Sequence, residues 1–263
     1  MILRRLTENL RGQNWTAITI EFLIVVTGVF IGTQVSNWNQ ERLEKQATKR
    51  MLDQLQPELR SQLEFFDGVT IYFATSRRYA DEAFAGWRGD PTISDERFVI
   101  AAYQASQITG IAINPDSWAL TFGGSQLRDI EDPKIRRNLE LTLTADYAPV
   151  EFTAVATRYR EQVRHVIPID IQDKVRIECG DRNVPGKEGA ILIVLPTTCA
   201  TKIEPAVAHQ IASALRARPD LVGELQWHLA AIATFMANVE TLSMPIRELE
   251  KELAATSVPA KAS

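Results

Sequence analysis

TAITIEFLIVVTGVFIGTQVSNWN, residues 16–39, is the stretch that decides how this chain is organised. It holds an apolar run of about twenty residues, which as a helix is long enough to cross the roughly 30 Å hydrocarbon core of a bilayer. Trp15 and Trp38 flank the run at positions where indole rings favour the headgroup layer. The sequence therefore predicts a transmembrane helix over residues 16–36, with these tryptophans as membrane-interface anchors in the lipid bilayer.

A cleaved signal peptide is the alternative interpretation of this run. Arg4, Arg5 and Arg11 precede it, as basic residues precede the apolar region of a signal. However, no small-x-small cleavage site follows Gly32. We therefore expect an uncleaved anchor, preceded by a cytoplasmic tail over residues 1–15.

One face of the predicted span is unusual for a purely lipid-facing helix. Glu21, Gly28 and Gly32 are spaced by seven and four residues, so they share a helix face that Val25 and Ser36 continue. A Gly-x-x-x-Gly pair lets two helix backbones approach closely, and ionisable groups in membrane spans usually face protein or water. We expect this docking face to contact a membrane protein partner or a second copy of the chain. It is defined by Glu21, Gly28, Gly32 and Ser36.

Glu21 also has a simpler interpretation. It lies close to the N-terminal end of the span. From there its carboxylate can reach back to water or to the arginines of the tail, at a cost below that at the bilayer centre.

The orientation of the span follows from its flanks. Basic residues lie on both sides, since Arg42, Lys45, Lys49 and Arg50 follow the anchor. Long domains cross a membrane largely regardless of charge, whereas a short arginine-bearing tail resists crossing. We therefore expect the N-terminus in the cytoplasm and the main domain outside it.

The two cysteines, Cys179 and Cys199, support that location. They flank a segment with strand-like residues, among them Val175 and Ile177 and the run 191–195, and with turn residues between them. We expect a β-hairpin insert over about residues 174–199, closed by a disulfide that contributes about 3 kcal/mol in the chain-entropy model. Disulfides persist in oxidising compartments such as the periplasm. Two unrelated buried thiols are the alternative, and no second ligand at short spacing points to a metal site.

Most of the remaining chain has helical periodicity. Helices are expected over residues 41–79, 94–110, 133–166 and 201–218, and in a last segment that includes residues 232–253. The first and last of these carry long apolar seams, so we expect them to pack on each other as antiparallel helices. Pro57 and Pro245 are expected to kink or interrupt these two helices, because proline removes a backbone donor.

Several residues predict helix ends. Ser94 is a plausible cap, Asp132-Pro133 opens a helix, and Thr201 to Glu204 has the spacing of a capping box. In the middle of the chain, Asp116 or Ser117 can cap a short helix that stops at Gly123-Gly124.

The expected fold is therefore mainly α: an N-terminal transmembrane helix that continues into an extracytoplasmic helical bundle with a small β-hairpin. The helical domain is expected over residues 37–254, and residues 255–263 form a small, polar and flexible tail.

Composition excludes some classes of function. The chain has 263 residues, 45% of them hydrophobic, and a net charge of −4. These values suit a globular domain with one anchor rather than a polytopic membrane protein. No basic patch with interleaved aromatic residues occurs, so we expect no nucleic-acid partner.

No catalytic, cofactor-binding or metal-binding residue is predicted. His165, His209 and His228 share no short spacing, and nucleophile-elbow, phosphate-loop and zinc-protease motifs are all missing from the sequence. Gly123-Gly124-Ser125 is better explained as a helix-ending turn than as an anion site. Trp118 and the Trp227-His228 pair are better explained by core packing than by a pocket. An enzyme with scattered catalytic groups remains an alternative.

The anchor region resembles the opening of a group of uncharacterised bacterial single-span membrane proteins. In these an apolar helix with an early glutamate runs into an Asn-Trp-Asn-x-x-Arg segment, which here is residues 37–42. The block from Ser117 to Leu139, with Trp118, Gly123 and Gly124, is similar to that family's middle block. The resemblance covers about the first 150 residues and implies an anchored helical domain in the bacterial inner membrane. It carries no activity and no catalytic residues.

Two functions fit these expectations. In the first, the protein is a non-enzymatic structural or accessory subunit that docks in a membrane assembly through its transmembrane helix. In the second, it is an extracytoplasmic ligand-sensing module. Such a module would have to signal through a partner protein, because the expected cytoplasmic tail of about fifteen residues is too short for an output domain.

Overall fold

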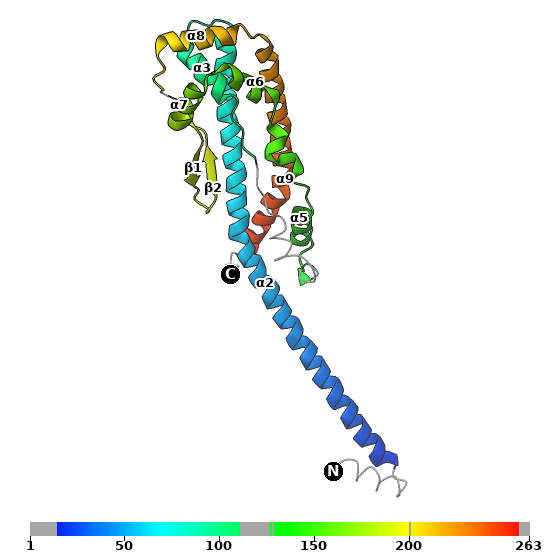
Figure 1. Ribbon diagram of the computed structural model, residues 1–263. Coiled ribbons are helices and arrows are strands. Elements are labelled where there is room, and N and C mark those ends of the chain that lie inside the picture. The colour runs from blue at the N-terminus through cyan, green and yellow to red at the C-terminus, as the bar shows by residue number, and fades with distance from the viewer. Residues whose placement is uncertain (1–14, 111–126, 128, 200, 258–263) are drawn as a thin grey trace. The chain divides into compact units, whose positions relative to one another are not determined.

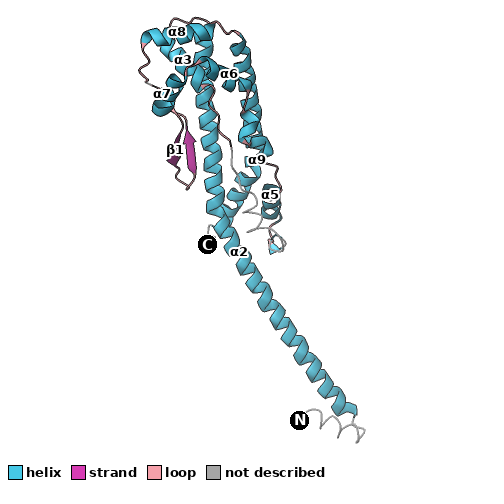
Figure 2. Ribbon diagram, viewed as in Figure 1, coloured by secondary structure: helices cyan, strands magenta, loops and turns pink. Residues whose placement is uncertain are grey.

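The computed structural model describes residues 15–110, 127, 129–199 and 201–257. The chain divides into two compact units, residues 1–51 and 52–263. Helix α2 (Trp15–Trp87) begins in the first unit and continues into the second (Figure 1). The fold is mainly helical with one small antiparallel hairpin, as the sequence predicts (Figure 2).

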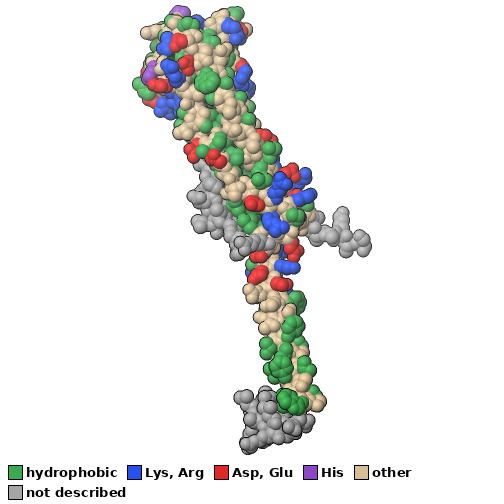
Figure 3. All heavy atoms as spheres, turned by 90° about the vertical axis from the view of Figure 1, so that its right-hand side faces the viewer, with side chains coloured by type: hydrophobic (Ala, Val, Ile, Leu, Met, Phe, Trp, Pro, Cys, Tyr) green, Lys and Arg blue, Asp and Glu red, His purple; other side chains and the backbone are tan. Residues whose placement is uncertain are grey.

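In the first unit, the beginning of α2, through about residue 36, is apolar and mostly exposed. It is long and apolar enough to cross a membrane, and none of its most apolar stretch is buried. Hydrophobic side chains cover much of the visible face of this part of α2 in Figure 3, and charged side chains follow it. Such a surface is expected where lipid rather than protein surrounds a helix.

In the second unit, α2 packs antiparallel to α9 (Asp220–Ser257). Arg60 Nε donates to Glu250 Oε1 at 2.8 Å, and Arg247 Nη2 donates to Asp67 Oδ1 at 2.6 Å. Farther along, the rings of Phe73 and Phe235 meet edge to face with their centres 5.3 Å apart. Residue numbers rise along α2 as they fall along α9, which confirms the predicted antiparallel pair.

Both helices continue through their internal prolines, so neither Pro57 nor Pro245 ends its helix, and of the predicted kink or interruption the interruption is wrong. α2 continues beyond the predicted end near residue 79 to Trp87. The leucines on either side of Pro57, Leu55 and Leu59, are fully buried, and Ile246 beside Pro245 is too. Burial of these side chains on both sides offsets the lost backbone donor, because each contributes about 1.5–3 kcal/mol.

Helices α3 (Asp95–Gln104) and α8 (Pro205–Arg216) pack against each other. The predicted cap at Ser94 is confirmed, since its hydroxyl accepts from Arg97 N at 3.1 Å. The predicted capping box is wrong: α8 begins at Pro205 after Glu204, and Thr201 Oγ1 instead donates to Glu96 on α3. α3 also ends six residues earlier than Gly110.

The segment 133–166 is not one helix. α5 (Pro133–Leu143) is capped by Asp132 as predicted and packs on α9, and two short 3₁₀ turns, η2 (Ala148–Val150) and η3 (Phe152–Val155), follow it. Helix α6 (Arg158–Val166) then begins. Pro149, which has no backbone N–H, lies in the first of the two 3₁₀ turns and disfavours a continuous α-helix there.

The region around Cys179 and Cys199 consists of a helix followed by a β-hairpin. α7 (Ile169–Cys179) includes Val175 and Ile177, so their assignment to a strand is wrong. Strands β1 (Arg182–Pro185) and β2 (Ile191–Val194) pair antiparallel, with Arg182 opposite Val194. Gly189 has a φ of +92°, a backbone conformation that residues other than glycine rarely adopt.

The core of the second unit is rich in tyrosine and phenylalanine. Its largest fully buried side chains include Tyr72, Tyr79, Tyr103, Tyr159, Phe66, Phe98 and Phe235. The buried hydroxyl groups are bonded: Tyr159 donates to Ala102 O at 2.8 Å and Tyr79 to Pro196 O at 2.8 Å. These bonds avoid the cost of a buried unpaired polar group.

Some expectations fall on residues that the structure does not describe. The predicted cap at Asp116 or Ser117 and the turn at Gly123-Gly124 lie outside the described residues, as do Trp118 and Ser125. Of the predicted tail over 255–263, residues through Ser257 belong to α9, and the rest lie outside the described part.

Candidate functional site

The predicted docking face lies on the first part of α2. Gly28, Gly32 and Ser36 are exposed, and Glu21 is half-buried. A methyl group added at either glycine meets no atom within 4 Å. The two glycines therefore leave an open, shallow strip along the helix where another backbone can approach closely.

Glu21 differs from the hydroxyl residues near it. Thr19 Oγ1 donates to Trp15 O at 2.9 Å, and Thr33 Oγ1 donates to Phe30 O at 2.8 Å, so these hydroxyls are satisfied within their own helix. The Glu21 Oε2 atom is shielded from solvent and has no hydrogen-bond partner among the described residues. No described residue satisfies this acceptor.

Trp15 and Trp38 mark the two ends of this face. Both indoles are largely exposed on α2. Their separation of 23 residues corresponds to about 35 Å along a helix, slightly more than the hydrocarbon core. The spacing suits two interface anchors on opposite sides of one bilayer.

Cys179 and Cys199 form a disulfide, with their Cα atoms 5.4 Å apart. It joins the end of α7 to the segment that follows β2. The side chain of Gln104 holds the same point, because its Nε2 donates to Cys179 O at 2.6 Å. The predicted pairing is therefore present in the structure, and it fastens the hairpin to the helical core.

The tip of the hairpin is held by a carboxylate that the sequence did not indicate. Glu64 of α2 accepts hydrogen bonds from Lys187 N at 2.5 Å and from Glu188 N at 2.8 Å. Burial raises the pKa of Glu64, but these backbone donors and that of Ala190 outweigh it and bring the pKa below its usual range. A side chain at Gly186 would collide with the same carboxylate. No local pattern could have shown this contact, since it spans 123 residues.

Two arginines of α6 lie half-buried against the end of α3. Arg160 Nη1 donates to Ser106 O at 2.7 Å, and Arg164 Nη2 donates to Gln107 Oε1 at 2.9 Å. The Arg164 guanidinium also lies 4.8 Å from the centre of the Tyr103 ring. Burial lowers the pKa of both arginines. These bonds and the aromatic contact join α6 to the end of α3, and the carboxylate of Asp181 interacts electrostatically with both arginines.

The neighbouring residues Trp227 and His228 differ in burial. His228 is fully buried, with its Nδ1 atom 2.7 Å from Thr157 Oγ1. Burial, with a smaller effect of the Arg160 charge, lowers the pKa of His228 to about 4. Trp227 is 67% exposed and lines a hollow of about 420 Å³ on α9, so its predicted core packing is wrong. Consecutive helix residues point about 100° apart, so only one of the two can face the core.

Asp95 and His209 form a pair that resembles part of a catalytic triad. His209 Nδ1 lies 2.7 Å from Asp95 Oδ2, and Arg216 Nη1 donates to Asp95 Oδ1 at 2.8 Å. The hydrogen bond with His209, followed by that from Arg216, lowers the pKa of Asp95. No hydrogen bond joins His209 to a nucleophilic side chain in the described part of the chain. The pair therefore fastens α3 to α8. The remaining histidine, His165, is exposed.

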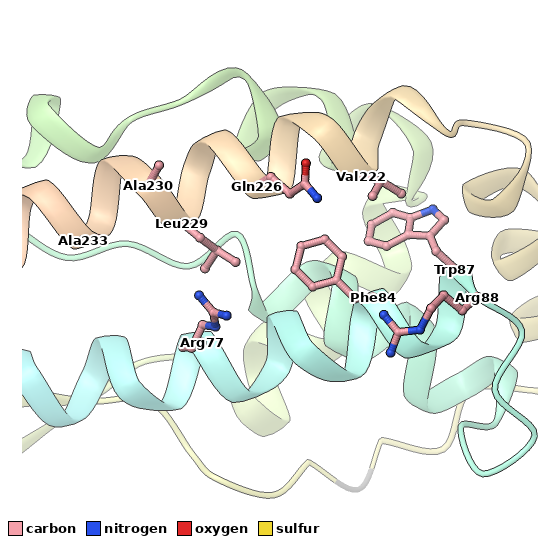
Figure 4. Close-up of a pocket in the computed structure, with 9 residues that line it drawn as sticks. All are labelled: Arg77, Phe84, Trp87, Arg88, Val222, Gln226, Leu229, Ala230 and Ala233. Carbon is pink, nitrogen blue, oxygen red and sulfur yellow. The ribbon is translucent and has the colours of Figure 1, made fainter.

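An open groove runs between α2 and α9 within the second unit. Its volume is about 660 Å³, within the range of small-molecule sites. Phe84 and Trp87 of α2 and Leu229 of α9 form its apolar surface, and Arg77, Arg88 and Gln226 are its polar residues (Figure 4). We call it the α2–α9 groove. The sequence did not indicate it, because its two walls are more than 130 residues apart.

No group of three or more histidine, cysteine or acidic residues in the described ranges can hold a metal ion. Comparison with known proteins adds no relative: no family model, no curated protein and no solved structure matches this chain.

Proposed function

We propose that this protein is a single-pass membrane protein and a non-enzymatic accessory subunit, which docks in a membrane assembly through its transmembrane helix. The observation that carries the proposal is the carboxylate of Glu21. It has no partner among the described residues, and it shares a helix face with two glycines that leave open space. In lipid, an unsatisfied acceptor is costly, so a donor on a neighbouring helix stabilises the docked state.

The proposed location is the bacterial inner membrane, with the N-terminus in the cytoplasm and the second unit in the periplasm. Three arginines in the tail before the span favour this orientation. The Cys179–Cys199 disulfide supports it, since such bonds persist in oxidising compartments. The resemblance of residues 37–42 to a bacterial single-span family is consistent with the same membrane.

Fusion proteins test this orientation. With the C-terminus in the periplasm, a C-terminal alkaline phosphatase fusion is expected to be active and a C-terminal green fluorescent protein fusion dark. A fusion at residue 14, before the span, serves as the control and should give the opposite pattern. An active phosphatase at residue 14 together with a bright C-terminal fluorescent protein would reverse the proposed topology.

Substitutions on the docking face test the association. Replacing Gly28 and Gly32 by isoleucine should weaken association at least about tenfold, because helix packing in lipid depends on close backbone approach. Glu21→Leu should weaken it more than Glu21→Gln, since the amide still forms a hydrogen bond. The measurement is co-purification through a C-terminal tag in mild detergent, with mass spectrometry of the retained proteins.

Val26 and Phe30 on the opposite face provide the matched control. Alanine at both positions should leave association unchanged. If these two positions prove sensitive and the glycine variants behave as wild type, the docking face is not the interface. Membrane fractionation of every variant checks that the anchor still inserts.

The α2–α9 groove favours a second candidate, a ligand-sensing module that signals through a partner protein. Its volume and its mixture of aromatic and basic side chains suit a small molecule. In this candidate, the docking face would carry the signal to the membrane partner.

A further inference from the structure

The α2–α9 groove combines an apolar surface with hydrogen-bond donors. Phe84 and Trp87 point from α2 towards α9, and Leu229 points back towards α2 (Figure 4). The Trp87 Nε1 atom already donates to Leu215 O at 2.9 Å, so this indole presents only apolar surface to a ligand. The middle of the groove therefore suits an aliphatic or aromatic body.

The polar residues of the groove select the charge of such a ligand. None of the described residues that line it is acidic, and two are arginines. Arg77 Nε donates to Asp81 Oδ1 at 3.2 Å, so part of its charge is already compensated. No ion pair of Arg88 within 4 Å is found among the described residues, although its charge helps to lower the pKa of the nearby Asp90, whose Oδ1 atom accepts from Thr92 at 2.7 and 2.9 Å. The Arg88 guanidinium thus remains open to an anion.

We propose that the α2–α9 groove binds an amphipathic organic anion. The anionic head, a carboxylate or phosphate, pairs with Arg88, while Gln226 lies on the opposite wall of the groove, on α9. The apolar body lies over Phe84 and Leu229 towards Arg77. Arg77 of α2 and Arg88, the residue that follows its end, both line the groove and are eleven residues apart, so about 16 Å is available to the whole ligand.

This inference deepens the ligand-sensing candidate and rests on it for the consequence of binding, but not for binding itself. Two sources supply the same chemistry, a free fatty-acid-like anion and an anionic lipid of the bilayer. Both combine an acidic head with an aliphatic chain, so the test must separate them.

Calorimetric titration of the full chain in phosphatidylcholine nanodiscs, with empty discs subtracted, measures the binding of octanoate. We expect saturable binding that Arg88→Gln weakens about tenfold, as is typical when a charge-assisted hydrogen bond is lost. Octanol, which has the same body without the charge, should bind more weakly and equally well to both proteins. Ala233→Phe fills the groove from an exposed position of α9 and should abolish the binding of both compounds.

Matched control variants separate the site from general effects. Arg78→Gln removes an exposed charge next to Arg77 but outside the groove, and Ala237→Phe adds the same ring one turn farther along α9. Both should bind octanoate as the wild type does. Octanoate binding that is non-saturable, or that is equally strong in Arg88→Gln and Ala233→Phe, overturns the proposal.

Nanodiscs that also contain phosphatidylglycerol identify the source. If this lipid remains with the wild type in native mass spectrometry, is lost from Arg88→Gln, and competes with octanoate, the bilayer supplies the ligand. Unchanged octanoate binding in these discs supports a free organic anion. If octanoate binds but leaves co-purification of the membrane partner unchanged, the groove stands and only the sensing candidate fails.

Discussion

Replacing Cys179 and Cys199 together by serine is expected to lower the free energy of unfolding of the second unit by about 3 kcal/mol, because the bridge restricts the unfolded chain over a 20-residue separation. The hairpin should loosen first. It is held by the disulfide, by the Gln104 bond to Cys179 O and by the Glu64 contacts at its tip. Denaturant unfolding of the full chain in detergent, followed by far-ultraviolet circular dichroism, measures the loss.

Reductant provides the control for this prediction. Dithiothreitol should destabilise the wild type by a similar amount and leave the double serine variant unaffected. Mass analysis of an unreduced digest should contain the linked peptides of Cys179 and Cys199. Two free, alkylatable thiols in the native protein would contradict both the bridge and its contribution to stability.

The second large effect is a loss of stability in mild acid. Burial lowers the pKa of His228 to about 4 in the folded protein, below the ordinary value of 6.5 that applies to the unfolded chain. Between these two values the unfolded state binds more protons, so the contribution of His228 is fully present above pH 6.5 and is lost as the pH falls towards 4. The loss amounts to about 3 kcal/mol, since one pKa unit corresponds to about 1.4 kcal/mol.

Denaturant midpoints measured from pH 7.5 to pH 4 on the full chain test this effect. His228→Gln should be less stable than the wild type at pH 7.5, because the packing against Tyr159 changes, but its stability should depend less on pH. His165→Gln is the control. Because His165 is exposed, the denaturant midpoint of this variant should depend on pH as that of the wild type does. If the denaturant midpoint of His228→Gln falls with decreasing pH as steeply as that of the wild type, other groups cause the acid sensitivity.

Features set by a few neighbouring residues could be predicted from the sequence. The cap at Ser94 and the start at Asp132-Pro133 depend on groups two or three residues away, so local chemistry decides them. The apolar helix before residue 37 follows from composition alone, because no partner is needed to form it. The antiparallel pair of α2 and α9 was also predictable, since two long seams need a common partner.

Elsewhere, local rules were outweighed by packing. The helices continue past Pro57 and Pro245, whose neighbours are buried, and Val175 lies in a helix despite its strand propensity. Helix propensity amounts to less than about 1 kcal/mol for an ordinary residue and about 3 kcal/mol for proline, whereas the burial of several large side chains together contributes more. A prediction from propensity fails where the two disagree.

The sequence by itself determined the apolar helix, the helical class, the pairing of two cysteines and the presence of a small hairpin, although not its first strand, because each depends on composition or on short spacing. Only the tertiary structure decided that Trp227 faces outward while His228 is buried, that Glu64 holds the hairpin tip, and that Arg88 and Leu229 line one groove. These contacts join residues far apart in the chain. Their energies depend on distance in space, which spacing along the sequence does not encode.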